Sequence, residues 1–343
     1  MALVETPLSH FALSAPGKIF ILGEYGVLAG LPALIGTFGP RFRLEGSLAS
    51  PYSSHGGNAW SPHPESPAGL LLRELESQAK EVARFPIPTA MRFWDPHRGK
   101  GGMGASTAQF ALLWQSVSQG LQSAEFVHEQ SSISAAAQCW RLYRRLTRTE
   151  SGLPPSGADV FAQTAALRKG AIDPGWWLFD SEEPERSAEL THFPADRIVV
   201  LLASTQPGRK VPTHTHLNEL SPAETLRQIR DALQEPILKA MRALREREQS
   251  PNGAHEAWRE FAAQCGVFAK RMEALGWVHP ETLKDLEELV RFPGVLSAKG
   301  AGALQADALV ICLDSTLTLE QTHSVQNELK AWAKARGYSV VWG

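Results

Sequence analysis

The residues best suited to chemistry lie in a glycine-rich segment that leads directly into an apolar, helix-forming stretch. The segment consists of Lys100, Gly101, Gly102, Met103, Gly104, Ala105, Ser106 and Thr107. Its glycines can adopt positive φ angles and let the backbone approach a ligand closely. The helix expected over residues 106–121 presents unpaired N–H groups and the positive end of its dipole to this loop. Together these features predict an anion site, most often one for phosphate, with two hydroxyl side chains as contacts to phosphate or to Mg²⁺.

The spacing matches neither of the two common phosphate-binding motifs. A P-loop ends in Gly-Lys-Ser/Thr, whereas Lys100 precedes the last glycines here. A dinucleotide-binding motif needs an acidic residue about 20 positions further on, and none lies near Gln122. The alternative interpretation is a flexible glycine linker, and the apolar run from Phe110 to Trp114 argues against it. We therefore expect a nucleotide-phosphate loop of a less common type.

A second segment places charged residues at the two ends of an apolar run. Lys18 opens the run that ends at Leu22, and Glu24 and Tyr25 follow after a glycine. The run predicts a buried strand, so these side chains are expected at a strand edge. The alternative is that Lys18 simply flanks a strand.

Two more segments combine small residues with a charged one. Asp159 follows Ser156 and Gly157 at the beginning of a helix-forming stretch, where it can serve as a general base, a metal ligand or a helix N-cap. The run 297–307, Ser-Ala-Lys-Gly-Ala-Gly-Ala-Leu-Gln-Ala-Asp, contains Ala301 and Gly302 and is expected to be a loop. Such a loop either closes over a bound phosphate or makes a tight connection.

The elements that must position these segments follow from hydrophobic periodicity and turn residues. Strands are expected at 18–22, 197–203, 308–313 and 338–342, with a turn and a second apolar strand over 27–35 and a short candidate at 90–96. Helices are expected at 70–83, 106–121, 131–146, 222–248, 254–275, 280–291 and 319–335, the last with Thr318 as N-cap. Residues 49–67 are expected to form a long loop, and residues 170–185 to form a break. The pattern predicts an α+β fold.

Length and composition set wider limits. The chain has 343 residues, 43% hydrophobic and 20% charged, which is typical of a globular protein of two domains. The net charge of −2 gives no general attraction to nucleic acid or membranes. Three widely spaced cysteines favour a reducing, cytoplasmic setting without a disulfide framework. We expect neither a signal peptide nor a membrane-spanning segment, since no apolar stretch approaches ~18 residues.

Taken together, the four segments resemble the motifs of the GHMP kinase superfamily. Ala15-Pro16-Gly17-Lys18 with Gly23-Glu24-Tyr25 is similar to the first motif. The run Gly-Met-Gly-Ala-Ser-Thr at 102–107 resembles the second motif, Gly-Leu-Gly-Ser-Ser-Ala, and 156–159 resembles the catalytic aspartate segment. The run 299–303 resembles a third motif that usually carries more glycines. The resemblance implies a ribosomal-protein-like α+β domain over 1–190 and a ferredoxin-like α+β domain over 191–343.

The resemblance also implies roles for individual residues. Asp159 would orient or deprotonate the acceptor hydroxyl, and Lys18 would pair with it and polarise the acceptor oxygen. Ser106 would bind Mg²⁺, and the glycine loop would hold the β- and γ-phosphates of ATP. Glu150 is a candidate second metal ligand, although mevalonate kinases place that glutamate further upstream.

The acceptor is expected to be a hydroxy acid or a phosphorylated hydroxy acid of the mevalonate pathway. Tyr25 after the glutamate favours phosphomevalonate, because mevalonate kinases usually have histidine there. Arg209 and Lys210 are predicted to contact phosphate or carboxylate of the acceptor, or else to form a solvated basic loop. Glu24, Tyr25, Ser156, Gly157, Ala301 and Gly302 complete the predicted acceptor site. The alternatives are mevalonate kinase, diphosphomevalonate decarboxylase and a non-catalytic nucleotide- or metabolite-binding homologue; a homodimer remains open because family members are often dimers.

Overall fold

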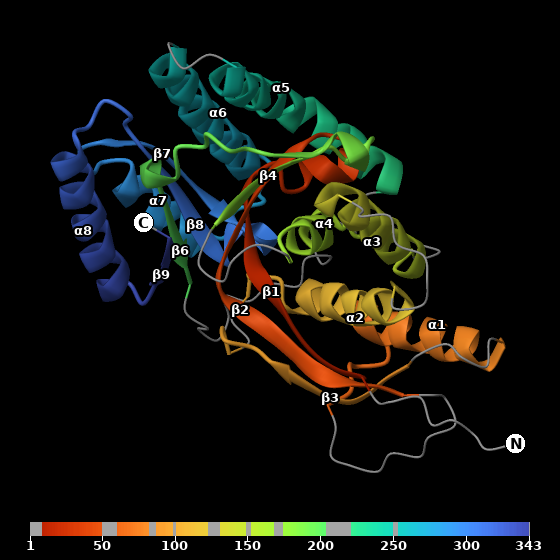
Figure 1. The fold of residues 1–343 in the computed structure, drawn as a ribbon. Coiled ribbons are helices and arrows are strands. Elements are labelled where there is room, and N and C mark those ends of the chain that lie inside the picture. The colour runs from red at the N-terminus through yellow and green to blue at the C-terminus, as the bar shows by residue number, and fades with distance from the viewer. Residues whose placement is uncertain are drawn as a thin grey trace, which may run out of the picture.

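The computed structural model describes residues 9–49, 60–81, 87–98, 101–122, 131–148, 152–167, 174–203, 221–249 and 253–342. In these residues the chain forms two antiparallel sheets with helices packed against them (Figure 1). The first sheet has five strands in the order β1-β2-β4-β5, with β3 also paired to β2. The second has four strands in the order β7-β8-β6-β9. The described part of the chain is thus an α+β structure, as the sequence predicts.

The first sheet carries the lysine and the helices that face it. Its strands are β1 (Ser9–Leu22), β2 (Ala33–Ala49), β3 (Ile87–Trp94), β4 (Gly175–Phe179) and β5 (Ala188–Glu189). Its helices are α1 (Pro67–Glu81), α2 (Ala105–Gln122), α3 (Ser132–Leu146) and α4 (Ala158–Ala165). Helices α2 and α4 pack on β1 and β2, which places both helix N-termini near the lysine strand (Figure 1).

The second sheet is covered on both faces. Its strands are β6 (Ile198–Leu202), β7 (Val295–Ala301), β8 (Ala308–Leu313) and β9 (Ser339–Trp342). Its helices are α5 (Pro222–Gln249), α6 (Ala254–Ala274), α7 (Pro280–Leu289) and α8 (Leu319–Ala335). The sequence of strand β6 is an unbroken apolar run because both faces of the strand are buried. Val200 belongs to the core under α6, and Val199 packs against α7 and α8.

One hydrophobic core joins the two sheets. It contains Ile19 of β1, Phe38 of β2, Val200 of β6 and Phe268 of α6, all at most 2% exposed. The aromatic ring of Trp342 in β9 lies 6.2 Å from that of Phe38. The apolar interiors of the two sheets are therefore continuous, and the division of the chain into domains at residue 190 stays a prediction.

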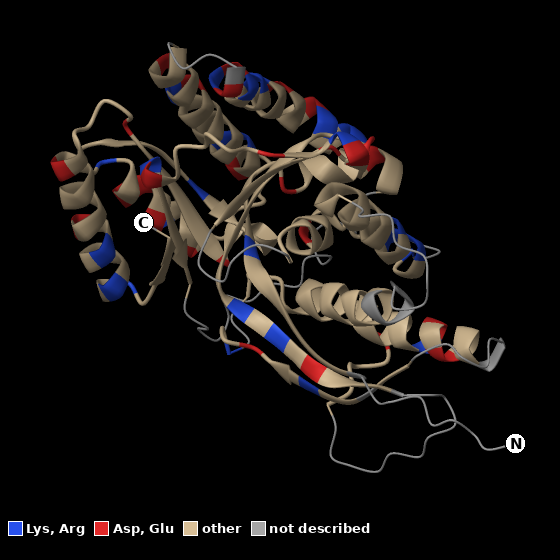
Figure 2. Ribbon diagram, in the orientation of Figure 1, with Lys and Arg blue, Asp and Glu red and all other residues tan. Residues whose placement is uncertain are grey.

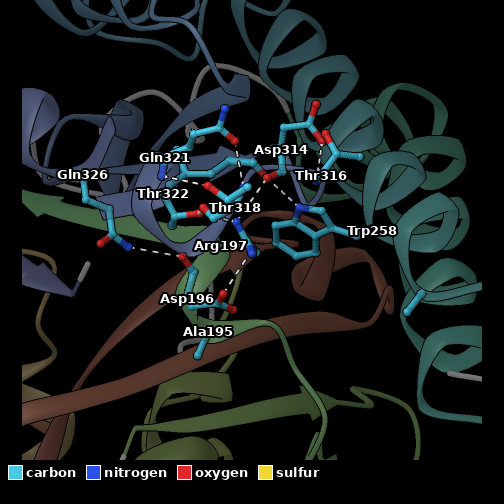
Figure 3. Close-up of polar contacts among 12 residues, drawn as sticks. Ala195, Asp196, Arg197, Trp258, Asp314, Thr316, Thr318, Gln321, Thr322 and Gln326 are labelled. Carbon is cyan, nitrogen blue, oxygen red and sulfur yellow. Dashed lines mark hydrogen bonds and ion pairs between the residues drawn. The ribbon is translucent and has the colours of Figure 1, made fainter. Parts of the chain in front are cut away.

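A polar cluster anchors the outer end of the second sheet (Figure 3). Arg197 hydrogen-bonds the side chain of Thr322 in α8 and pairs with Asp196 at 3.1 Å. Gln326 donates to the backbone oxygen of Asp196 at 3.2 Å, and the Trp258 indole donates to the Leu313 carbonyl at 2.7 Å. These bonds fix α8 and α6 to the strand ends.

Charged residues of both signs are interspersed along the outer helices and along β2 and β3 (Figure 2). Among the described helices, none is both long and apolar enough to cross a membrane.

Two sequence predictions about the elements are wrong. The expected break at 170–185 contains β4, an inner strand of the first sheet, because its short apolar run lies next to acidic turns. The expected loop at 297–307 begins as strand β7, which extends to Ala301, so the loop itself covers only 302–307. The other expected strands and helices are present among the described residues, most within a few residues of the expected bounds, although β1 and β2 run well beyond theirs.

Candidate functional site

A lysine and an aspartate from different elements form an ion pair at the edge of the first sheet. Lys18 lies in β1, and Asp159 lies in the first turn of α4. Lys18 Nζ is 3.6 Å from Asp159 Oδ2, and the two side chains are 12% and 22% exposed. The other carboxylate oxygen, Oδ1, accepts from the Val160 N–H at 3.1 Å. The pair is therefore held by the protein yet remains within reach of a small molecule.

The glycine loop lies directly against this lysine. The Lys18 N–H donates to the Met103 carbonyl at 3.0 Å, and the Met103 side chain is fully buried. Gly104 has φ +78°, and a Cβ there would lie 2.9 Å from Lys18 Cε. Because an L side chain rarely adopts that φ and would meet the lysine, glycine is required at 104. The close approach places the start of α2 beside the ion pair.

The two hydroxyls after the loop point in different directions. Ser106 is exposed in the first turn of α2, where the backbone N–H groups of the helix are unpaired. The Thr107 hydroxyl is buried and hydrogen-bonds the Gly104 carbonyl at 3.0 Å and Gln163 Oε1 at 2.7 Å. The buried hydroxyl of Thr107 thus takes its partners inside the protein, and the predicted contact of Thr107 with phosphate or metal stays a prediction.

Gln163 is a site residue that sequence reasoning missed. It lies in α4 four residues after Asp159 and is 0% exposed. Its amide nitrogen donates to the Pro16 carbonyl at 2.8 Å and to the Gly104 carbonyl at 3.2 Å. The available signal is a long polar side chain in an otherwise small and apolar helix, one turn after the aspartate.

Glu24 forms a buried ion pair with Lys299 of β7, while its predicted contact with the acceptor stays a prediction. The Lys299 Nζ–Glu24 Oε1 distance is 2.7 Å, and the two side chains are 0% and 6% exposed. Burial raises the pKa of Glu24 above its ordinary value, although Lys299 acts in the opposite direction. The pair links the two sheets, since Lys299 Nζ also lies 3.4 Å from the Phe20 carbonyl.

Tyr25 makes a second link between the sheets. Its hydroxyl accepts from the Leu304 N–H at 3.1 Å, and its ring centroid lies 5.2 Å from that of Trp277. Burial raises the pKa of Tyr25. Leu304 and Gln305 both have positive φ, +46° and +52°, so this contact holds a strained turn in the loop. The predicted role of Tyr25 at the acceptor therefore stays a prediction, while its contact with the loop is structural.

Asp307 brings the glycine loop and the 302–307 loop together. A Cβ added to Gly101, Gly102 or Gly302 would overlap the Asp307 side chain. Gly102 and Gly302 also have positive φ, +80° and +89°. Because these glycines have no side chains, both loops can pack against the Asp307 carboxylate. The Asp307 N–H donates to the Ala301 carbonyl at 3.0 Å, which holds Asp307 in place.

The remaining predicted residues divide into two groups. Gly157 is the N-cap of α4 with φ +70°, closely packed on Trp140, and Ser156 Oγ accepts from the Ala158 N–H at 3.4 Å. Both fix the beginning of the aspartate helix. Lys100, Glu150, Arg209 and Lys210 lie outside the described residues.

A magnesium ion would find few protein ligands among the described residues of the site. Within the described residues, no three His, Cys, Asp or Glu side chains are grouped closely enough to hold a metal ion. Mg²⁺ usually binds one or two protein oxygens and takes its other ligands from phosphates and water. The hydroxyl of Ser106 and the carboxylate of Asp159 are oxygen donors of this kind beside the glycine loop.

The fold of the described residues is similar to that of solved structures of GHMP-type kinases. The structure of Streptococcus pneumoniae phosphomevalonate kinase is similar over 97% of this chain and 98% of that chain, with a TM-score of 0.61 and 15% identity. Mevalonate kinase of L. major with R-mevalonate has a TM-score of 0.57 at 13% identity, with 98% of each chain covered. Lactococcus lactis galactokinase with galactose has a TM-score of 0.60 at 11% identity, with 97% of this chain and 92% of that chain covered. No protein-family model matches the sequence, and no curated protein matches it either.

Proposed function

We propose that the protein is a small-molecule kinase that transfers the γ-phosphoryl group of ATP to a hydroxyl of a mevalonate-pathway acid. The observation that carries this proposal is the Lys18–Asp159 pair, 3.6 Å apart, beside a glycine loop and the N-terminus of α2. Phosphoryl transfer requires mainly alignment and neutralisation of charge. The pair and the loop supply both within one small region.

Each group has a chemical task under this proposal. The Asp159 carboxylate accepts a hydrogen bond from the acceptor hydroxyl and takes up its proton as the new P–O bond forms. The Lys18 ammonium stabilises negative charge that develops on the acceptor oxygen. Backbone N–H groups at the start of α2 hold the phosphates. Mg²⁺, held by Ser106 together with the nucleotide, would offset the charge of the phosphates when bound.

Phosphomevalonate is the acceptor we favour, with mevalonate as the alternative. The support is Gly23-Glu24-Tyr25, which resembles phosphomevalonate kinases, and the basic residues Arg209 and Lys210, which suit an acceptor that already carries phosphate. A solved phosphomevalonate kinase of this fold carries phosphomevalonate and AMPPNP. ATP and Mg²⁺ are thus the proposed cofactors, and the partner is a small molecule.

The test is an ADP-release assay at saturating MgATP with mevalonate, phosphomevalonate and diphosphomevalonate offered separately. We expect turnover with phosphomevalonate and a loss of at least about 100-fold in kcat in Asp159→Asn, the lower range for a missing general base. Asp314→Asn, which changes a carboxylate at the far end of β8, is the matched control and should keep kcat. Turnover with none of the three acids would refute the pathway assignment, and equal turnover in Asp159→Asn would refute the role of the aspartate.

A further inference from the structure

We propose that Gln163 is a positioning residue for phosphoryl transfer: its side-chain amide fixes the glycine loop against the strand of Lys18 and the helix of Asp159. The inference rests on the proposed function, because it concerns the same site. It adds a residue that none of the sequence motifs contains.

Three hydrogen bonds from one buried amide connect three segments of the site. The nitrogen donates to Pro16, two residues before Lys18, and to Gly104, the last glycine of the loop. The oxygen accepts from Thr107 at 2.7 Å, in the first turn of α2. Gln163 itself lies one turn after Asp159, so both side chains leave α4 on the same face. One buried amide therefore adds three bonds to the Lys18–Met103 and Lys18–Asp159 contacts that hold lysine, aspartate and loop together.

The bond to Gly104 sets the direction of a phosphate-binding N–H. In a trans peptide the carbonyl and the following N–H point in opposite directions. Gly104 has no side chain to restrain the peptide that joins it to Ala105, and its φ of +78° is open chiefly to glycine. Gln163, Thr107 and the Ala108 N–H at 2.9 Å all hold the Gly104 oxygen on the inner side. The Ala105 N–H is thereby directed outward, toward an anion at the start of α2.

Thr107 supports this assignment independently. It stands where the second motif of the GHMP superfamily has alanine, and its hydroxyl is buried rather than exposed to a ligand. Its hydroxyl supplies a hydrogen bond to Gln163 Oε1. Thr107, where this sequence differs from the motif, and Gln163, which lies outside the motif, are thus one hydrogen-bonded pair.

The decisive measurement is nucleotide affinity, determined by titration calorimetry with MgADP, together with KM for ATP and for the acceptor. Gln163→Leu leaves two carbonyls without the amide, and we expect at least a tenfold increase in the Kd for MgADP and in KM for ATP. The acceptor KM should change less than twofold. Thr107→Val keeps the shape of the side chain and should weaken MgADP binding in the same direction, by a smaller factor. Its effect should disappear when Gln163→Leu is already present, because the two residues form one unit.

Gln326→Leu is the matched control, since Gln326 is also a buried glutamine bonded to a backbone carbonyl, at the far end of the second sheet (Figure 3). It should lower Tm and leave the Kd for MgADP unchanged. If Gln163→Leu and Thr107→Val lower Tm but bind MgADP as the wild type does, Gln163 is a structural core amide and the inference is wrong. If Gln163→Leu does not fold, Thr107→Val decides by the same criterion. A wild type that binds no MgADP refutes the proposed function and this inference together, whereas equal binding by wild type and variants refutes this inference alone.

Discussion

Removing Lys299 from its buried ion pair should destabilise the whole protein in a pH-dependent way. Lys299→Met keeps an unbranched side chain, one heavy atom shorter, but leaves the Glu24 carboxylate, 6% exposed, without the Lys299 cation. Breaking a buried pair in this way costs about 3–5 kcal/mol. Unfolding entropy of about 2.1 cal/mol/K per residue, applied to 343 residues, gives about 0.7 kcal/mol/K, so Tm should fall by about 4–7 °C if the chain unfolds as one unit.

The sign of the pH dependence follows from Glu24. Burial raises its pKa in the folded protein, and Lys299→Met removes the two contributions by which Lys299 lowers it. A carboxyl whose pKa is raised by folding stabilises the fold when protonated, at low pH, and this stability is lost as pH rises through the folded-state pKa. The loss of Tm in Lys299→Met should therefore be larger at pH 8 than at pH 5.

Thermal unfolding followed by circular dichroism at both pH values tests this reasoning. Adding Glu24→Gln to Lys299→Met should restore most of the lost stability, because the buried charge is then gone. Lys239→Met is the control: its pair with Glu235 has a similar N–O distance of 2.8 Å, but the two side chains are 50% and 62% exposed, so Tm should hardly change. An unchanged Tm in Lys299→Met, or no rescue by Glu24→Gln, would refute the argument.

Three further changes test other contacts. Gly302→Ala places a methyl group against Asp307 at a backbone position with φ +89°, so Tm should fall and the Kd for MgADP should rise. Gly253 has open space around it, so Gly253→Ala should change neither quantity. Equal behaviour of the two variants would contradict the packing argument. Tyr25→Phe removes the acceptor of the Leu304 N–H and should cost about 1 kcal/mol in urea unfolding, and no loss would show that this bond is not needed. Thr318→Ala removes the capping box of α8 and should also cost about 1 kcal/mol, which Thr318→Ser should largely avoid.

Most of the fold could be predicted because its elements carry strong local signals. Strands β6 and β8 are continuous apolar runs that are buried on both faces. The capping box that begins with Thr318 indicates the start of α8. Strand β7 could not be recognised, because Ser-Ala-Lys-Gly-Ala has the composition of a turn. It is a strand only because β8 supplies its hydrogen-bond partners.

The site could be predicted only where one segment is sufficient to define a role. The glycine loop and the lysine strand are local patterns, and the structure brings Lys18 and Asp159 together. Lys299 as a fully buried cation could not be foreseen, because its partner Glu24 lies 275 positions away. The three contacts of Gln163 likewise depend on folding segments that are distant in sequence.

The continuous core has a consequence for synthesis on the ribosome. Phe38 and Trp176 of the first sheet make ring contacts with Trp342, which follows Phe38 by about 300 residues and can join them only after it has been made. At about 5–20 residues per second, the apolar side of the first sheet is exposed for roughly 15–60 s in each round of translation. The nascent chain is therefore a natural client for chaperones that shield apolar surface, and fragments released early should be prone to aggregation.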